Sequence, residues 1–145
     1  MRALIQRVKK GSVTIDGKLF SSIGPGFVIL LGIFTTDNES DINKLLLKIL
    51  NLRIMDDEKG VMNKSIIETK GEILIVSQFT LCADTQKGRR PSYIDAMKPT
   101  EAEKLYQIFV NKLNDSGLKI QTGKFGELME VEIINDGPTT IMLES

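Results

Sequence analysis

Apolar and polar residues alternate along the first part of the chain, which is typical of strands that bury one face. This pattern predicts strands at residues 2–8, 12–15, 19–23 and 26–33. The Asp16-Gly17 pair between two of these runs predicts a two-residue hairpin turn. Gly24-Pro25-Gly26 has the look of a phosphate-binding loop, but an apolar strand follows it where such a loop needs a helix. We therefore interpret it as a turn.

The apolar spacing changes to three or four residues after Asn38, which indicates an amphipathic helix that ends near Arg53. A second helix is predicted over residues 99–117, where the spacing of Thr100 and Glu103 is that of a capping box. The remaining apolar runs predict further strands, at 72–76, 119–122, 129–134 and 139–143.

No repeat, low-complexity tract or linker interrupts these elements. Residues 1–145 are therefore expected to form a single α/β domain, because helices and strands can then bury their apolar faces against one another. We expect a strand-rich sheet or barrel-like core with two main amphipathic helices.

Composition narrows the possible chemistry, because the chain contains no histidine. This excludes Ser-His-Asp and Cys-His nucleophilic machinery and zinc sites of the His-Glu-x-x-His type. The single cysteine, Cys82, permits no internal disulfide and no thiolate cluster, and a packing role is favoured for it. The acidic run at 56–58 is interpreted as a solvated turn, not a metal site. We expect no metal ion and no cofactor.

Basic and acidic residues balance at 19 each, so any contact with RNA must be local. The densest basic cluster, Lys87-Gly88-Arg89-Arg90, is compatible with phosphate binding or with a solvated turn. The longest apolar stretch, residues 27–34, is far shorter than the roughly 18 residues that suggest a membrane span. The first residues lack the pattern of a secretory signal, so we expect a soluble, cytoplasmic protein without membrane contact.

Two polar segments stand out against this apolar background. Ser77-Gln78-Phe79-Thr80 follows the strand predicted at 72–76 and is either a site or the point where a strand runs into a polar loop. Asn135-Asp136-Gly137-Pro138-Thr139-Thr140 separates two apolar runs and is, on its residues alone, most simply a turn.

These segments belong to a series of blocks that resemble, in order, the D-aminoacyl-tRNA deacylase family, also called D-tyrosyl-tRNA deacylases. The blocks are residues 1–8, 23–26, 49–53, 77–81, 87–92, 121–123 and 135–138. Ser77 to Thr80 match the family's Ser-Gln-Phe-Thr motif, and residues 135–140 match its Asn-x-Gly-Pro-Val-Thr motif. Thr139 replaces the usual Val and Cys82 a common Tyr, and we expect neither change to alter the chemistry.

The resemblance implies an aminoacyl-tRNA editing hydrolase that removes D-amino acids, or glycine, from tRNA and spares L-aminoacyl-tRNA. It further implies a homodimer in which Gly137-Pro138 of one subunit, joined by a cis bond, enters the pocket of the other. The backbone carbonyls there would receive the substrate ammonium group and exclude an L side chain. By the same likeness, Arg7 would hold this loop through hydrogen bonds, and Lys87, Arg89 and Arg90 would contact tRNA.

The family likeness also implies RNA-assisted catalysis, which needs no histidine because the 2′-hydroxyl of the terminal adenosine takes part. The catalytic block would be Ser77 to Thr80, with main-chain N–H groups around Phe79 and Thr80 donating to the oxyanion. Thr80 is a candidate nucleophile as well, but no base in the sequence obviously activates it, so we favour a positioning role. Phe125 and Met129 are candidate pocket residues or simply core.

Two other classes of function stay open at this point. A non-catalytic module that binds RNA ends would use the basic loop without turnover. A small-molecule esterase would cleave free amino-acid esters as well as the ester on tRNA.

Overall fold

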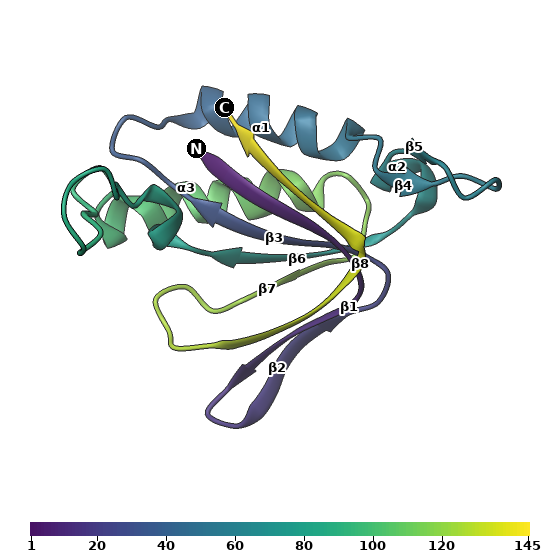
Figure 1. Cartoon of the computed structure of the whole chain (residues 1–145), viewed down its shortest axis with the longest axis horizontal. Coiled ribbons are helices and arrows are strands. Elements are labelled where there is room, and N and C mark those ends of the chain that lie inside the picture. Colours follow the sequence, from purple (N-terminus) through teal and green to yellow (C-terminus); the bar gives the residue numbers. More distant parts are fainter.

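A mixed sheet with two long helices on one face makes up most of the molecule (Figure 1). The computed structural model describes residues 1–145. In chain order the elements are β1 (Arg2–Ile15), β2 (Lys18–Ile23), β3 (Gly26–Gly32), α1 (Glu39–Asn51), β4 (Met55–Asp56), β5 (Met62–Lys64), α2 (Ile66–Thr69), β6 (Glu72–Ser77), the 3-10 helix η1 (Phe79–Cys82), α3 (Pro99–Asn114), β7 (Ile120–Thr122) and β8 (Glu130–Glu144). The expected α/β class is confirmed.

Strand β1 organises the sheet because it pairs along both of its edges. Antiparallel β8 accompanies it over almost its whole length. The other edge pairs with β3 at residues 2–8 and with β2 at residues 11–15, both antiparallel. Parallel β6 and then β7 continue the sheet beyond β3. The hairpin turn predicted at Asp16-Gly17 joins β1 to β2, and both residues have positive φ, 50° and 72°.

Two pairs of predicted strands are in fact single long strands. The runs at 2–8 and 12–15 form one strand, because its pairing with β8 continues on both sides of the exposed Lys9 and Lys10. The runs at 129–134 and 139–143 likewise form β8, and the turn predicted between them is wrong. Val8 pairs with Asn135 and Gln6 with Thr140, so the four residues between lie opposite one residue of β1. This is a bulge within a strand.

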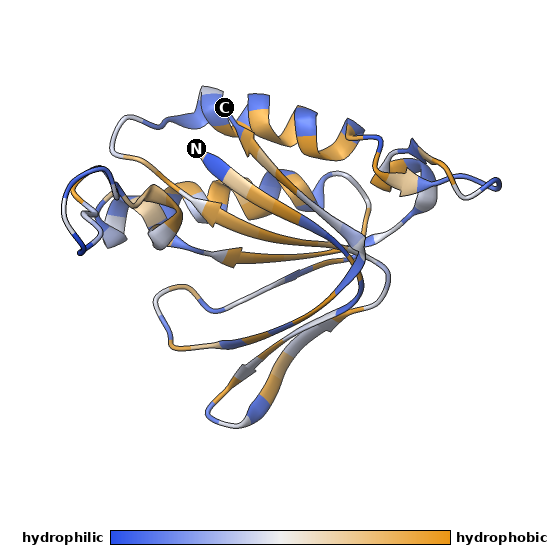
Figure 2. Cartoon of the chain, viewed as in Figure 1, coloured by the Kyte–Doolittle hydropathy of each residue, from blue (hydrophilic) through white to orange (hydrophobic).

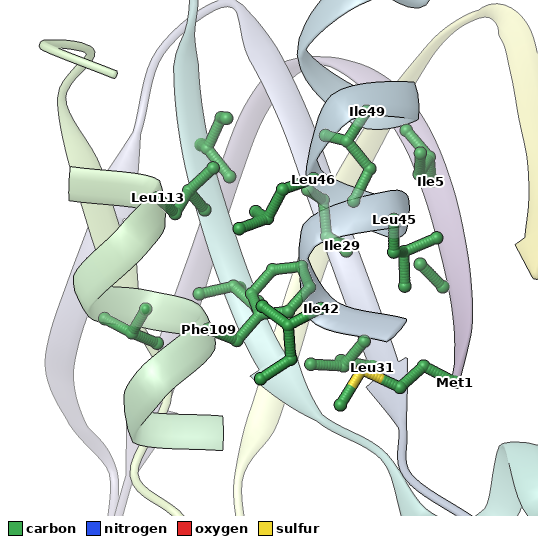
Figure 3. Packing of buried hydrophobic residues seen from close by; sticks show 14 of the residues in the cluster. Met1, Ile5, Ile29, Leu31, Ile42, Leu45, Leu46, Ile49, Phe109 and Leu113 are labelled. Carbon is green, nitrogen blue, oxygen red and sulfur yellow. The ribbon is translucent and has the colours of Figure 1, made fainter. Parts of the chain in front are cut away.

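The main core lies between the sheet and the two long helices. It is formed by apolar side chains of β1, β3 and β6 that pack against α1 and α3 (Figure 3). In Figure 2 the helices turn their apolar faces toward the sheet, as the spacing of three and four residues predicts. Burying these faces is what holds both helices on the sheet.

A smaller core lies on the opposite face of the sheet, which curls so far that it nearly closes into a barrel. Its buried members come from β1, β2, β3 and β6: Val8, Val13, Ile23, Val28, Leu74 and Val76. The Ser21 hydroxyl donates to the Thr122 carbonyl at 2.8 Å and so links β2 to β7. In Figure 1 the β7–β8 connection lies on the same side of the molecule as the ends of β3 and β6.

The helix caps differ from expectation. Helix α3 begins at Pro99, and its N-cap, Lys98, makes no side-chain capping bond. The capping box predicted from Thr100 and Glu103 is therefore wrong, since the proline starts the helix before Thr100 can cap it. Reciprocal capping boxes occur instead on α1, with Asn38, and on the short helix α2, which the sequence pattern did not predict. No helix is long and apolar enough to span a membrane.

Candidate active site

A cavity of about 750 Å³ opens where β3 and β6 end. Its floor is formed by the last residues of these strands, and its walls come from η1, the segment before α3, the start of α3 and the β7–β8 connection. Of its 18 lining residues, 12 are hydrophobic, so the cavity suits an apolar or aromatic group more than a highly charged one. The charged lining residues are Lys98 and Glu127.

The Ser77–Thr80 motif reaches this cavity with three of its four residues. Ser77, Gln78 and Phe79 line the wall, whereas Thr80 is exposed and is not part of it. The Gln78 main-chain N–H donates to the Leu31 carbonyl at 2.8 Å, which fixes the motif to the end of β3.

The backbone of the motif turns at once into η1, whose first residues are Phe79 and Thr80. As the leading residues of a 3-10 turn, their main-chain N–H groups have no acceptor within it. Neither N–H group donates to a main-chain carbonyl elsewhere in the chain. The Thr80 hydroxyl accepts a hydrogen bond from the Gln78 amide nitrogen, and an amide cannot take up the hydroxyl proton.

Phe125 and Met129 both line the cavity, from the connection that crosses above it. The Phe125 ring packs 5.6 Å from the ring of Tyr106, centroid to centroid. Tyr106 is buried and donates to the Ile75 carbonyl at 2.9 Å, and burial raises its pKa far above the usual range, so its hydroxyl stays neutral. Met129 passes close to Gly123, where an added Cβ would lie 2.8 Å from the Met129 sulfur. The glycine of the Gln-Thr-Gly block thus leaves room for this wall.

The basic loop lies beside the cavity. Asp84 and Ser92 close it with a pair of main-chain hydrogen bonds of 2.8 and 2.9 Å, and Lys87, Arg89 and Arg90 are exposed between them. None of the three forms an ion pair. The loop leads directly into Tyr93, whose ring packs edge-on against Phe79 at 5.0 Å. Tyr93 is a cavity residue that the sequence reasoning missed.

Gly137 and Pro138 do not line this cavity. They lie on the bulge of β8, both exposed, and the peptide bond between them is cis. The Asn135 side chain spans the bulge: its oxygen accepts from the Thr139 N–H at 2.9 Å, and its nitrogen donates to the Thr140 hydroxyl at 2.8 Å.

Arg7 lies under the same bulge and is almost fully buried. Its Nε donates to the Asp136 carbonyl at 3.3 Å, immediately before Gly137. Its Nη1 donates to Asp56 Oδ1 at 2.7 Å. The Asp56 side chain is 44% exposed, as expected of a solvated acidic turn, but it also pairs with a buried arginine from a distant strand, which the local sequence did not predict. Only the fold brings the two together.

Cys82 is buried, as expected of a packing residue. Burial raises the pKa of its thiol, so at neutral pH it carries its proton and is a poor nucleophile. No group of three or more His, Cys, Asp or Glu side chains is arranged to hold a metal ion.

The chain is similar to known proteins along almost its whole length. Residues 4–144 match the family model described as D-Tyr-tRNA(Tyr) deacylase. The D-aminoacyl-tRNA deacylase of Aquifex aeolicus is 54% identical over 100% of the chain and 98% of the relative. That of Bacteroides thetaiotaomicron is 55% identical over 100% of the chain and 97% of the relative.

Solved structures share the fold of the chain. The structure titled "c-Myc DNA Unwinding Element Binding Protein" superposes with a TM-score of 0.95 at 44% identity and covers 100% of the chain and 99% of its own. A probable eukaryotic D-amino acid tRNA deacylase, 17% identical over 99% of the chain and 98% of its own, has a TM-score of 0.87 and shares the fold. The chain therefore belongs to the D-aminoacyl-tRNA deacylase family and is a hydrolase of that family.

Proposed function

We propose that this enzyme edits charged tRNA in the cytoplasm by removing D-amino acids and glycine, and that it works as a homodimer. One observation carries the proposal. Ser77, Gln78 and Phe79 of the first motif line a cavity, whereas the bulge of β8 that carries Gly137 and Pro138, here called the Gly137–Pro138 loop, lines no part of it, and both of these residues are exposed. A site that uses both motifs therefore needs the loop of a second chain.

In the proposed dimer, the loop closes the partner's cavity with its backbone. The carbonyls of Gly137 and Pro138 receive the substrate ammonium group and occupy the space that an L side chain would need. Exclusion of this kind discriminates through a clash and leaves the cavity free to accept different D side chains. Glycine, which has no side chain, passes the same gate.

Hydrolysis in this proposal relies on orientation and on main-chain donors. Water attacks the ester carbonyl carbon, and the N–H groups of Phe79 and Thr80 stabilise the negative oxygen that develops. The bond to the 3′ oxygen of the terminal adenosine then breaks, and that oxygen gains a proton. The neighbouring 2′-hydroxyl assists the proton transfers. This assignment suits a chain without histidine in which the Thr80 hydroxyl accepts a hydrogen bond from the Gln78 amide.

Phosphates of the tRNA end would lie on Lys87, Arg89 and Arg90. These cations are exposed. The last of them, Arg90, is separated from the cavity residue Tyr93 by Pro91 and Ser92 alone. Since the whole chain has no net charge, this local cluster is the natural place for a phosphate contact.

The decisive experiment is deacylation of D-Tyr-tRNA, Gly-tRNA, L-Tyr-tRNA and free D-tyrosine methyl ester by the same preparation. The expected result is turnover of the first two only. Binding of tRNA without turnover would instead indicate an RNA-end-binding module, and cleavage of the methyl ester at a comparable rate would indicate a general esterase. Equal turnover of D- and L-Tyr-tRNA would overturn the gate.

The dimer is tested by complementation between two inactive variants. One carries Gln78→Ala and Phe79→Ala in the cavity, and the other carries Gly137→Val in the loop. In a mixed dimer, the first variant supplies an intact loop and the second supplies an intact cavity. These two parts can form one complete site only if the loop of one chain enters the cavity of the other. Recovery of activity on mixing would support the arrangement, and its failure in demonstrably mixed dimers would remove it.

A further inference from the structure

The Arg7 guanidinium is held from two sides. On one side its Nε donates to the Asp136 carbonyl at 3.3 Å and lies 3.4 Å from the Asp136 carboxylate. On the other side its Nη1 donates to the Ile54 carbonyl at 2.9 Å and to Asp56 Oδ1 at 2.7 Å. Arg7 thus bridges the bulge of β8 and the β4–β5 hairpin. The bend of β8 lies beside β4 and β5 in Figure 1.

The hairpin that carries Asp56 is itself firmly shaped. The Asp57 carboxylate accepts from the main-chain N–H groups of Lys59 and Val61 at 2.9 and 3.0 Å, and these bonds lower its pKa. Arg53, just before β4, donates to the Asn63 side chain on β5 at 2.7 Å. A short hairpin fixed in this way presents its first carboxylate at a defined position.

The hairpin and Arg7 also reach the far side of the loop. The sulfur of Met62 lies 4.0 Å from the Thr139 hydroxyl. The Arg7 Nη2 would lie 3.3 Å from a Cβ added at Gly137, so the guanidinium stands directly beside the glycine. The loop is therefore supported immediately before and immediately after its Gly-Pro pair.

Of the two ion pairs that Arg7 makes, the one with Asp56 is shorter: Nη1 lies 2.7 Å from Asp56 Oδ1, whereas Nε lies 3.4 Å from Asp136 Oδ2. Asp136 is also shared with Lys9, at 3.7 Å. A buried guanidinium that loses its nearer carboxylate has to turn toward the remaining one or toward water. Either movement changes the group that braces the loop.

We propose that Asp56 is a positioning residue for the discrimination between D- and L-aminoacyl esters. It holds Arg7 in the one arrangement that keeps the Gly137–Pro138 carbonyls in place. This inference rests on the proposed function, in which these carbonyls form the gate. It adds a residue outside both family motifs and on a hairpin that does not line the cavity.

The test compares Asp56→Ala and Asp56→Asn with Glu58→Gln. Glu58 is a matched control, because it is a carboxylate on the same hairpin that pairs with Lys64 and does not touch Arg7. The readout is the ratio of kcat/KM for D-Tyr-tRNA to that for L-Tyr-tRNA, measured alongside Tm. We expect Asp56→Ala to lower this ratio by about 10- to 100-fold, the scale of a misplaced gate. Asp56→Asn, which retains an acceptor oxygen, should lower it less, and Glu58→Gln should leave it unchanged.

Mixed dimers locate the effect. Asp56→Ala paired with a chain whose cavity is disabled by Gln78→Ala and Phe79→Ala should regain wild-type discrimination, because the working cavity then receives an intact loop. Asp56→Ala placed in the disabled chain should impose poor discrimination on its wild-type partner. If Asp56→Ala only disturbed the folding of its own chain, it would not change the discrimination shown by the cavity of the partner chain.

The outcomes separate this inference from the proposed function. A wild type that fails to discriminate removes the proposed function itself. A discriminating wild type together with folded Asp56 variants that keep its D-to-L ratio removes the role of Asp56 alone. If Asp56→Ala does not fold, the ratio measured for Asp56→Asn decides.

Discussion

The cavity is enclosed mainly by apolar side chains, whereas the Gly137–Pro138 loop is held almost entirely by polar contacts. Phe79, Phe125 and Leu128 form walls whose exact outline can shift by small rotations of side chains. The loop instead depends on directed bonds from Asn135 and Arg7 to backbone atoms. Apolar walls adapt to different substrates, but a gate made of backbone must be fixed in position.

This difference assigns the two regions different tasks. In the proposed function, the cavity would provide volume and contact area for the end of a charged tRNA, so changes in its wall should affect the strength of binding. The Gly137–Pro138 loop would provide the fixed geometry of the gate, so changes there should affect which enantiomer is accepted.

The largest effect should come from Gly137→Val. Gly137 has φ of +118°, and an added Cβ would lie 2.6 Å from the Thr139 hydroxyl and 3.1 Å from its main-chain nitrogen. A side chain must therefore displace the loop. We expect loss of D-Tyr-tRNA deacylation by about 100-fold or more in single-turnover assays.

A matched control for this variant is Gly17→Ala. Gly17 also has positive φ, +72°, but an added Cβ meets nothing within 4 Å. This change should cost about 1 kcal/mol of stability through backbone strain and leave deacylation intact. Equal losses in both variants would mean that positive φ alone, and not the position of the loop, limits activity.

Phe79→Ala should have the next largest effect. The Phe79 side chain lines the cavity yet is 59% exposed, so it contributes little to folding and offers its ring to a bound group. An aromatic contact with a base is worth about 1 to 3 kcal/mol, so tRNA affinity should fall accordingly. Phe20→Ala, at a residue 50% exposed on β2 that does not line the cavity, is the control. An unchanged KM in Phe79→Ala would show that the ring does not contact the substrate.

The sequence predicted the elements whose residues interact locally. The helix over residues 39–51 follows from its apolar spacing, and the turn at Asp16-Gly17 from its residue types. The Gly-Pro segment was interpreted wrongly as a turn between strands because its punctuation is that of a turn. Pairing with β1 on both sides keeps it within one strand, and a partner strand that is distant in sequence cannot be seen in a local pattern.

The candidate site likewise contains residues that the sequence identified and residues that only the folded structure revealed. The motif residues Ser77, Gln78 and Phe79 were identified through the family resemblance, and the structure places them on one cavity. Tyr93 was missed because it carries no local signal. The ion pair of Asp56 was missed because its arginine partner lies 49 residues away in sequence, and a solvated acidic turn gives no local sign of such a partner. Arg7 itself gave a clearer signal, because it lies on the same face of its strand as Ala3 and Ile5, which are buried. An arginine at such a position is expected to be buried and therefore to need partners.

A smaller effect is expected from Thr80→Ala. Thr80 does not line the cavity, and its hydroxyl accepts from an amide that cannot act as a base. Deacylation should therefore fall by less than about tenfold, as for the loss of a neutral hydrogen bond. A tRNA that ends in 2′-deoxyadenosine should, in contrast, be a poor substrate for the wild type. An acyl-enzyme trapped on Thr80 would reverse this assignment and make the threonine the nucleophile.

The smallest effect should come from Arg89→Glu combined with Arg90→Glu, because these residues neither line the cavity nor contact the loop that is proposed to select the enantiomer. The ratio of kcat/KM for D-Tyr-tRNA to that for L-Tyr-tRNA should stay at the wild-type value, whereas tRNA binding should weaken. The plot of log affinity against log salt should become shallower by roughly 0.7 for each phosphate contact that is lost. Titration of tRNA between low and physiological salt measures this slope, with Lys18→Glu on the distant β1–β2 hairpin as the control for a general change in charge. If both arginines can be reversed without altering the slope, tRNA approaches the cavity from another side.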